Sequence, residues 1–437
     1  MNITELTKEI INRRRLTRDD DLSFFETADL EELAAGANEI RQALCGNAVD
    51  LCTIINGRAG KCSENCKFCA QSSFHHTSCE TYGMLDTDVV LADCRAREAA
   101  GVHAYSIVTA GRTVEGEDLE KLIHTYEELR KNSKLRLCAS HGLLSPEAFF
   151  RLRDAGVTMY HTNIETSRRN FPNICTTHTY DDKIHEIKLA QAAGLAVCSG
   201  GIIGMGETFA DRLDMAVSLS ELGIVSIPIN ALIPVPGTPF AELPPLTEDD
   251  IIRAVAMFRY LNPDAYIRMA AGRSYFKDGG RRLFEAGVNA TITGDMLTTV
   301  GNNTKQDQEM LTDMGFQIWR MIYEQHSSEN KLKIYDSTDC YDCSHDRSNL
   351  CTGTTFYSNW SGADFTYQPC YLFFTVHSGN EKRNHQLPDL SSDRSGWNPG
   401  IFQLYQRSWQ TLWTNRWLSD RIYPAGTDRR LLYRSFS

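Results

Sequence analysis

The chain alternates between two hydrophobic patterns up to about residue 300. Short runs of β-branched and aromatic residues have the length of buried strands, and the stretches between them place apolar residues three and four positions apart, as amphipathic helices do. We expect strands at Cys52–Ile55, Tyr105–Val108, Leu135–Ala139, Thr158–Asn163, Ala196–Ser199, Ser226–Ala231, Tyr266–Ala270 and Ala290–Thr293. We expect helices at Asp118–Arg130, Pro146–Ala155, Asp181–Ala193, Phe209–Leu222, Glu248–Tyr260 and Gly280–Ala286. Eight such strand runs predict an α/β fold, a (β/α)8 TIM-type barrel, in which functional residues lie at the carboxyl ends of the strands.

The two ends of the chain differ from this alternation. Residues 1–50 show a helical apolar stripe, and we expect an N-terminal helical cap before a barrel over residues 51–320. After about Tyr335 neither period persists, although five of the six tryptophans lie there. We therefore expect residues 336–437 to be an extension of doubtful fold that is unstructured.

A glycine-bounded loop after the first predicted strand carries Cys62, Cys66 and Cys69 in a C-x3-C-x2-C spacing. Three thiolates can hold a [4Fe–4S] cluster and leave one iron open to a substrate or cofactor. This spacing resembles that of radical S-adenosylmethionine (SAM) enzymes. The alternative is structural zinc with His75 or His76 as the fourth ligand, which we disfavour because zinc sites usually pair their cysteines as two C-x2-C units.

Polar and sulfur-containing residues occupy the ends of other predicted strands, where a barrel interior would ordinarily carry Val, Ile or Leu. They are Ser106, Cys138, Asn163 with Glu165, Cys198, Asn230 and Arg268. A single buried cysteine is often only a small hydrophobic residue. Cys138 and Cys198 facing one barrel mouth with Arg268 instead indicate a second metal site.

Composition restricts the compartment and the partners. The net charge of −11 argues against nucleic acid as the main partner. The chain shows no export signal at its start and no run of about 18 apolar residues, so we expect a cytoplasmic protein without a membrane span. In a reducing compartment, clustered cysteines among the 14 are better interpreted as metal ligands or reactive thiols than as disulfide partners.

Five motifs resemble the biotin synthase family over roughly residues 10–320. They are Asn56–Cys62 with the two following cysteines, Tyr160–Ser167, Val197–Glu207, Ile227–Asn230 and Ile267–Arg273. The resemblance implies a radical SAM sulfurtransferase that converts dethiobiotin to biotin with a [4Fe–4S] cluster, SAM and an auxiliary iron–sulfur cluster. It also implies an electron donor such as flavodoxin or ferredoxin and a homodimer.

The same resemblance implies roles for individual residues. The ligands of the SAM-cleaving cluster correspond to Cys62, Cys66 and Cys69. Asn163 and Glu165 correspond to residues that contact SAM and substrate, and Asn230 to one that binds the ureido ring of dethiobiotin. The resemblance also implies that Arg268 is a catalytic residue, together with the three cluster cysteines.

One position departs from the usual family pattern. The family holds its sulfur-donating [2Fe–2S] cluster with three cysteines and an arginine, and Ser106 replaces the cysteine of the second strand. An additional thiol, Cys175, follows the fourth strand. We therefore predict that Cys138, Cys175 and Cys198 hold the auxiliary cluster near Arg268, with a larger cubane type as in an anaerobe-type branch of the family. The alternative is that Ser106 ligates a [2Fe–2S] cluster and Cys175 has no role.

Two further functions stay open at this stage. A radical SAM relative with a mutase or maturase role would need only the first cluster. A non-catalytic iron–sulfur or zinc sensor would need a single centre. The number of iron–sulfur clusters would distinguish both of these functions from that of a sulfurtransferase with two clusters.

A frameshift is our hypothesis for the extension. Phe356–Thr366, back-translated with allowed codons and read one nucleotide out of frame, can give Ser-Ile-Pro-Ile-Gly-Pro-Val-Pro-Ile-Ser-Leu. That stretch resembles the membrane component of biotin-uptake transporters. The coding DNA decides this hypothesis, because codon degeneracy makes such matches easy to obtain.

Overall fold

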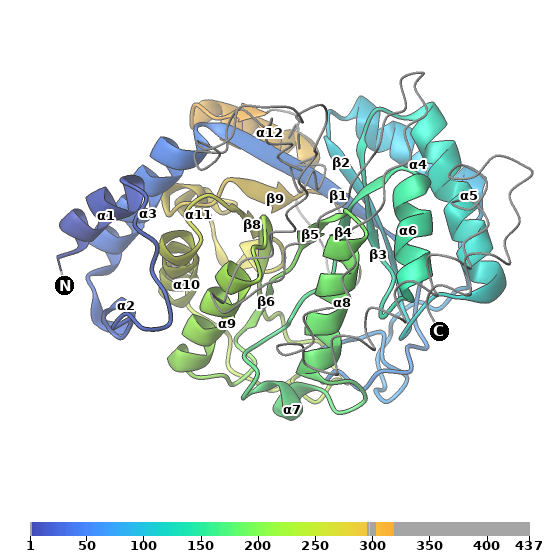
Figure 1. Ribbon diagram of the computed structural model, residues 1–437, viewed down its shortest axis with the longest axis horizontal. Helices are drawn as coiled ribbons and strands as arrows, with labels where there is room; N and C mark the ends of the chain where they lie inside the picture. The colour runs from blue at the N-terminus through green and yellow to red at the C-terminus, as the bar shows by residue number, and fades with distance from the viewer. Residues whose placement is uncertain (1, 295–296, 298–302, 319–437) are drawn as a thin grey trace, which may run out of the picture. The chain divides into compact units, whose positions relative to one another are not determined.

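Buried strand runs form a closed parallel barrel at the centre of the fold (Figure 1). The computed structural model describes residues 2–294, 297 and 303–318, and the predicted extension at 336–437 lies outside them. The strands are β1 (Ala48–Arg58), β2 (Ala104–Thr109), β3 (Arg136–Ser140), β4 (Val157–His161), β5 (Ala196–Cys198), β6 (Gly201–Ile203), β7 (Ser226–Ala231), β8 (Tyr266–Met269), β9 (Ala290–Ile292) and β10 (Gln317–Ile318). The barrel order is β1-β2-β3-β4-β5-β7-β8-β9, and β9 pairs with β1 to close it, so the predicted (β/α)8 fold class is confirmed.

The fifth position of the barrel is divided between two short strands. Strand β5 pairs with β7 through Cys198 and Ser226, and β6 pairs with the following residues of β7. Between them, Gly200 lies so close to β7 that a Cβ atom there would be 1.9 Å from the Pro228 carbonyl oxygen. Only glycine fits this approach. The hydrophobic pattern predicts that the strand ends at Ser199 and does not predict β6. The reason is that the glycines are required for a close backbone contact.

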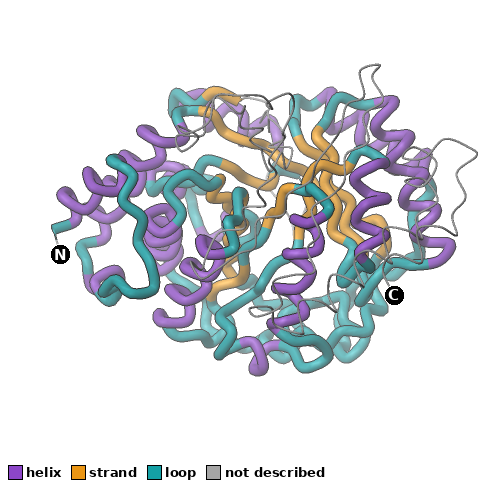
Figure 2. The backbone as a smooth tube through the Cα atoms, viewed as in Figure 1, coloured by secondary structure: helices purple, strands orange, loops and turns teal. Residues whose placement is uncertain are grey.

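Helices cover the outside of the strands (Figure 2). They are α4 (Thr87–Ala99), α5 (Gly116–Asn132), α6 (Pro146–Asp154), α7 (Phe171–Ile174), α8 (Tyr180–Ala192), α9 (Phe209–Glu221), α10 (Glu248–Leu261), α11 (Arg281–Glu285) and α12 (Thr304–Asp313), with a 3-10 turn η1 (Arg273–Tyr275). Helices α8, α9 and α10 each begin with a capping box of threonine and aspartate. No helix in the described part of the chain is both long and apolar enough to cross a membrane.

The N-terminal segment forms the expected helices α1 (Ile3–Ile11), α2 (Phe24–Thr27) and α3 (Leu30–Cys45). Helix α3 packs against α1 and α10, and the hydroxyl oxygens of Thr7 on α1 and Tyr260 on α10 lie 2.6 Å apart. Figure 1 shows these helices beside α10, on the outside of the barrel. Since β1 begins at Ala48, the predicted boundary at residue 50 falls inside the first strand.

Candidate active site

A cavity of about 330 Å³ opens at the carboxyl ends of the barrel strands. All eight barrel positions contribute side chains to it, as expected from the inward register of alternate strand residues. Its lining includes Cys52, Ile54, Ser106, Val108, Arg136, Cys138, Ser140, Met159, His161, Cys198, Ile202, Pro228, Asn230, Arg268 and Ile292. Asn163, Glu165, residues of the cysteine loop and residues that follow β7 and β8 also line it.

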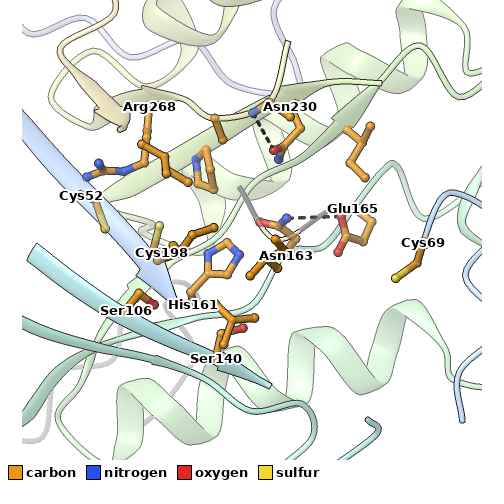
Figure 3. A pocket seen from close by; sticks show the side chains of 18 of the residues that line it. Cys52, Cys69, Ser106, Ser140, His161, Asn163, Glu165, Cys198, Asn230 and Arg268 are labelled. Carbon is orange, nitrogen blue, oxygen red and sulfur yellow. Dashed lines mark hydrogen bonds between the residues drawn. The ribbon is translucent and has the colours of Figure 1, made fainter. Parts of the chain in front are cut away.

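The cysteine loop is folded against itself by main-chain hydrogen bonds. The Cys62 amide donates to the Gln71 carbonyl over 2.9 Å, and the Ser73 amide donates back to the Cys62 carbonyl over 2.8 Å. The Gln71 side-chain oxygen accepts from the Gly60 amide at 3.0 Å. Cys69 lies at the cavity wall, where Figure 3 shows its thiol. These hydrogen bonds fold the loop so that Cys69 lies at the barrel mouth.

Cys175 does not join Cys138 and Cys198. Its sulfur lies 3.7 Å from the sulfur of Cys66 and 3.3 Å from Nδ1 of His178, on the cysteine loop side. The short helix α7 and a hydrogen bond from the Lys67 amide to the Ile174 carbonyl, 2.9 Å long, draw this segment onto the loop. The structure therefore does not bring Cys175 together with Cys138 and Cys198, the group with which we predicted it to hold the auxiliary cluster. Hydrogen bonds from Cys66 and His178 lower the pKa of the Cys175 thiol.

A thiol that the sequence reading overlooked takes that place. Cys52 on β1 is buried in one cluster with Cys138 on β3 and Cys198 on β5. A hydrogen bond between Cys52 and Cys138 raises the pKa of Cys52. The same bond, with the charge of Arg136, outweighs burial and lowers the pKa of Cys138 to about 7. Three sulfurs therefore lie together in the barrel interior.

Charged residues lie next to these sulfurs, deeper in the barrel interior. Arg268 on β8 donates to the Asp50 carboxylate and, over 3.0 Å, to the Thr291 carbonyl. Arg136 donates to the same Asp50 oxygen over 2.8 Å. Burial opposes the charge on Asp50, but the two arginines outweigh it and lower its pKa to about 2. The net positive charge of this triad favours thiolates beside it.

Ser106 also lies in this part of the cavity. It is buried, and in the β2–β3 pairing it stands opposite Cys138. The structure thus brings together Cys52, Cys138, Cys198, Ser106 and Arg268. Figure 3 shows Cys52, Cys198, Ser106 and Arg268 on one side of the cavity and Cys69 on the other.

Asn163 and Glu165 lie between these two groups of cysteines (Figure 3). The Asn163 amide donates to the Glu165 carboxylate over 3.3 Å, and its oxygen accepts from the Gly200 amide at 3.0 Å. Glu165 has a φ of 66°, a left-handed conformation that costs a non-glycine residue on the order of 1–3 kcal/mol. Burial raises the pKa of Glu165. Such strain concentrates at functional sites, so this pair is a candidate ligand-binding element.

Asn230 on β7 is fixed by backbone contacts. Its amide nitrogen donates to the Gly201 carbonyl over 3.1 Å, and its oxygen accepts from the Ala271 amide at 3.1 Å. The side-chain amide of Asn230 keeps one further donor hydrogen on its nitrogen and one further lone pair on its oxygen. Asn230 lines the cavity, so these can serve a bound molecule that needs both a donor and an acceptor.

Two protein-family models match consecutive parts of this chain. The Radical SAM superfamily model matches residues 58–219, and the Biotin and Thiamin Synthesis associated domain model matches residues 228–317. The first match contains Cys62, Cys66 and Cys69, and the second contains Asn230 and Arg268.

Curated relatives match over nearly their whole length. Biotin synthase of Clostridium beijerinckii is 65% identical over 314 residues, which cover 72% of this chain and 99% of the relative. Biotin synthase of Alkaliphilus metalliredigens is 64% identical over 318 residues, covering 73% of this chain and 100% of the relative. Among solved structures, methylornithine synthase (PylB) aligns with a TM-score of 0.64 at 19% identity, covering 72% of this chain and 97% of its own. That structural likeness supports the fold alone.

Proposed function

The chain belongs to the biotin synthase family of radical SAM enzymes, and from this premise we propose how its barrel mouth converts dethiobiotin to biotin by inserting sulfur. Family membership favours this reaction over the mutase, maturase and sensor alternatives. The observation that carries the proposal is the separation of two groups of cysteines across one cavity, with polar side chains between them (Figure 3).

We propose that Cys62, Cys66 and Cys69 hold the [4Fe–4S] cluster at the outer side of the cavity. The donor set fits, because three thiols sit on one preformed loop with Cys69 at the cavity wall. With SAM bound, such a cluster supplies the reductive cleavage that generates the primary carbon radical needed to remove hydrogen from unactivated carbon. Asn163 and the partly buried Glu165 would hold SAM beside it, and the closed barrel would keep water from the radical.

We propose that Cys52, Cys138 and Cys198 hold the auxiliary cluster, which supplies the sulfur, with Arg268 beside it. The donor set fits this group, because three buried sulfurs meet where aliphatic residues would otherwise fill the barrel. The charge of Arg268 and Arg136 favours thiolate ligands there. Iron and sulfide content distinguishes a [2Fe–2S] cluster from a larger cubane at this site.

Metal analysis tests the division into two sites. Anaerobically reconstituted full-length protein should contain iron and sulfide for two clusters per chain. A content equal to one cluster would instead favour a mutase, maturase or sensor role and would contradict the proposal.

We propose that Asn230 positions dethiobiotin through its ureido ring, which offers both a donor and an acceptor. Asn230→Ala should raise the KM for dethiobiotin roughly tenfold or more, because lost hydrogen bonds in a buried site cost about 1–3 kcal/mol. Steady-state assays that vary dethiobiotin measure this change. Cleavage of SAM without substrate should stay at the wild-type rate. An unchanged KM would show that Asn230 does not contact the substrate.

The extension gives a second expected result. A chain ending at Tyr335 should keep biotin formation within about twofold of the full chain, since all of the proposed site residues precede it. Activity and thermal unfolding of the two chains provide the comparison. Loss of folding on truncation would show that residues 336–437 form a required domain.

Other partners follow from the family alone. We propose that flavodoxin or ferredoxin supplies the electrons, that the enzyme is a homodimer and that it works in the cytoplasm. Reduction assays with each donor and size-exclusion chromatography with light scattering would test the first two.

A further inference from the structure

Cys66, Cys175 and His178 form a compact group of ligand atoms beside the cysteine loop. One ligand atom from each of the three lies within 4.8 Å of the others. Cys175 is buried, and Cys66 and His178 are partly buried. Cys175 and His178 have no part in the two cluster sites proposed above, so their convergence on Cys66 needs another explanation.

We propose that the cluster-free chain binds one thiophilic divalent metal ion, such as Zn²⁺, through Cys66, Cys175 and His178. A zinc ion holds thiolates at about 2.3 Å in tetrahedral geometry, so two bound sulfurs lie about 3.8 Å apart. The Cys66 and Cys175 sulfurs are 3.7 Å apart. This spacing suits two ligands of a single ion.

His178 lies at a position that suits a third ligand of the same ion. A sulfur and an imidazole nitrogen on one tetrahedral zinc ion lie about 3.6 Å apart. The two ring nitrogens of His178 are 3.3 and 3.9 Å from the Cys175 sulfur. A small rotation of the ring is therefore enough to bring a ring nitrogen to the spacing that two ligands of one ion require.

A carboxylate supports this histidine. Oε2 of Glu64 lies 2.5 Å from Nδ1 of His178 and accepts from the Thr177 hydroxyl over 2.7 Å. Metal-binding histidines usually donate their second ring N–H to such a carboxylate, which fixes the tautomer and orients the ring. With Nδ1 bonded to Glu64, Nε2 is left for the ion. Three protein ligands leave the fourth position to water.

The site has a consequence for cluster assembly that rests on the proposed function. Cys66 is both a ligand of this ion and a proposed ligand of the [4Fe–4S] cluster, so the two cannot be bound together. The ion would hold the cluster-free loop in place and would have to leave before the cluster is loaded.

Metal titration of the full-length, cluster-free chain under anaerobic, reducing conditions tests the site. Co²⁺ should bind at one per chain with thiolate-to-cobalt charge-transfer absorption, and Zn²⁺ should displace it. Cys175→Ala and His178→Ala should each weaken binding at least tenfold, and Glu64→Gln should weaken it about tenfold. Circular dichroism of each variant checks that the barrel is folded.

Cys62→Ala and Cys69→Ala are the matched controls, because they remove the other loop thiols. Both should bind Co²⁺ as the wild type does. If these two variants lose the ion while Cys175→Ala keeps it, the ion sits among the cluster cysteines and the proposal is overturned. Absence of charge-transfer absorption at stoichiometric Co²⁺ would also overturn it.

A second measurement separates this proposal from the proposed function. Preloaded Zn²⁺ should slow iron uptake during reconstitution in the wild type but not in Cys175→Ala. If no [4Fe–4S] cluster forms under any condition, the cluster assignment fails while the zinc titration still stands. If zinc does not slow iron uptake, competition for Cys66 is excluded.

Discussion

Replacing Cys62, Cys66 or Cys69 with alanine is expected to reduce 5′-deoxyadenosine formation from SAM to below about 1% of the wild-type rate, because two thiolates cannot hold a cluster with an open iron. Biotin formation should stop with it. An anaerobic assay with a chemical reductant measures both products. The physiological donor is then not needed.

Cys79→Ala is the control for this series. Cys79 is a partly buried cysteine beyond the loop, and its sulfur contacts only the Glu80 carbonyl among the hydrogen bonds of the described residues. This variant should cleave SAM at the wild-type rate. Wild-type 5′-deoxyadenosine formation in any of the three loop variants would contradict the assignment of the SAM cluster.

The second large effect concerns Cys52. Cys52→Ala should remove the auxiliary cluster and stop biotin formation, while 5′-deoxyadenosine is still produced, because the proposed ligands of the first cluster lie on the cysteine loop and not on the strands. Iron and sulfide content should fall to that of one cluster per chain. Mass spectrometry of the products and metal analysis of the same samples provide the two readings.

Two variants make this prediction specific. Cys175→Ala should keep both clusters and biotin formation, since the Cys175 sulfur lies beside Cys66 and away from Cys138. Ser106→Ala should be nearly harmless although Ser106 stands opposite Cys138, because the three thiolates hold the cluster and a hydroxyl oxygen is a poorer ligand for it than a thiolate. If Ser106→Ala loses the auxiliary cluster and Cys52→Ala keeps it, the oxygen of Ser106 is the third ligand and the Cys52 assignment fails.

The barrel could be predicted from sequence because each strand run carries its own signal. β-branched runs of the right length recur between amphipathic helices, and each predicted run overlaps a strand of the structure. The proposed first cluster site could be recognised as well, since Cys62, Cys66 and Cys69 lie within eight residues of one loop. Local spacing was enough for both.

Cys175 and Cys52 could not be assigned with the same evidence. Cys175 follows α7, and its direction is set by a tertiary hydrogen bond between Lys67 and Ile174, which no periodicity reveals. The Cys52 signal was present, because Asp50, Cys52 and Ile54 alternate along β1 and therefore share a face. It was overlooked because Cys52 begins the predicted strand, and the structure shows that β1 starts four residues earlier.

A single-turnover assay tests the central claim most directly. Reconstituted protein with two clusters is mixed anaerobically with dethiobiotin, SAM and a reductant, and the products are identified by mass spectrometry. We expect biotin to form together with 5′-deoxyadenosine and methionine, and the auxiliary cluster to lose its signal as the sulfur is transferred. Cleavage of SAM without any biotin, in protein that holds both clusters, would contradict the account.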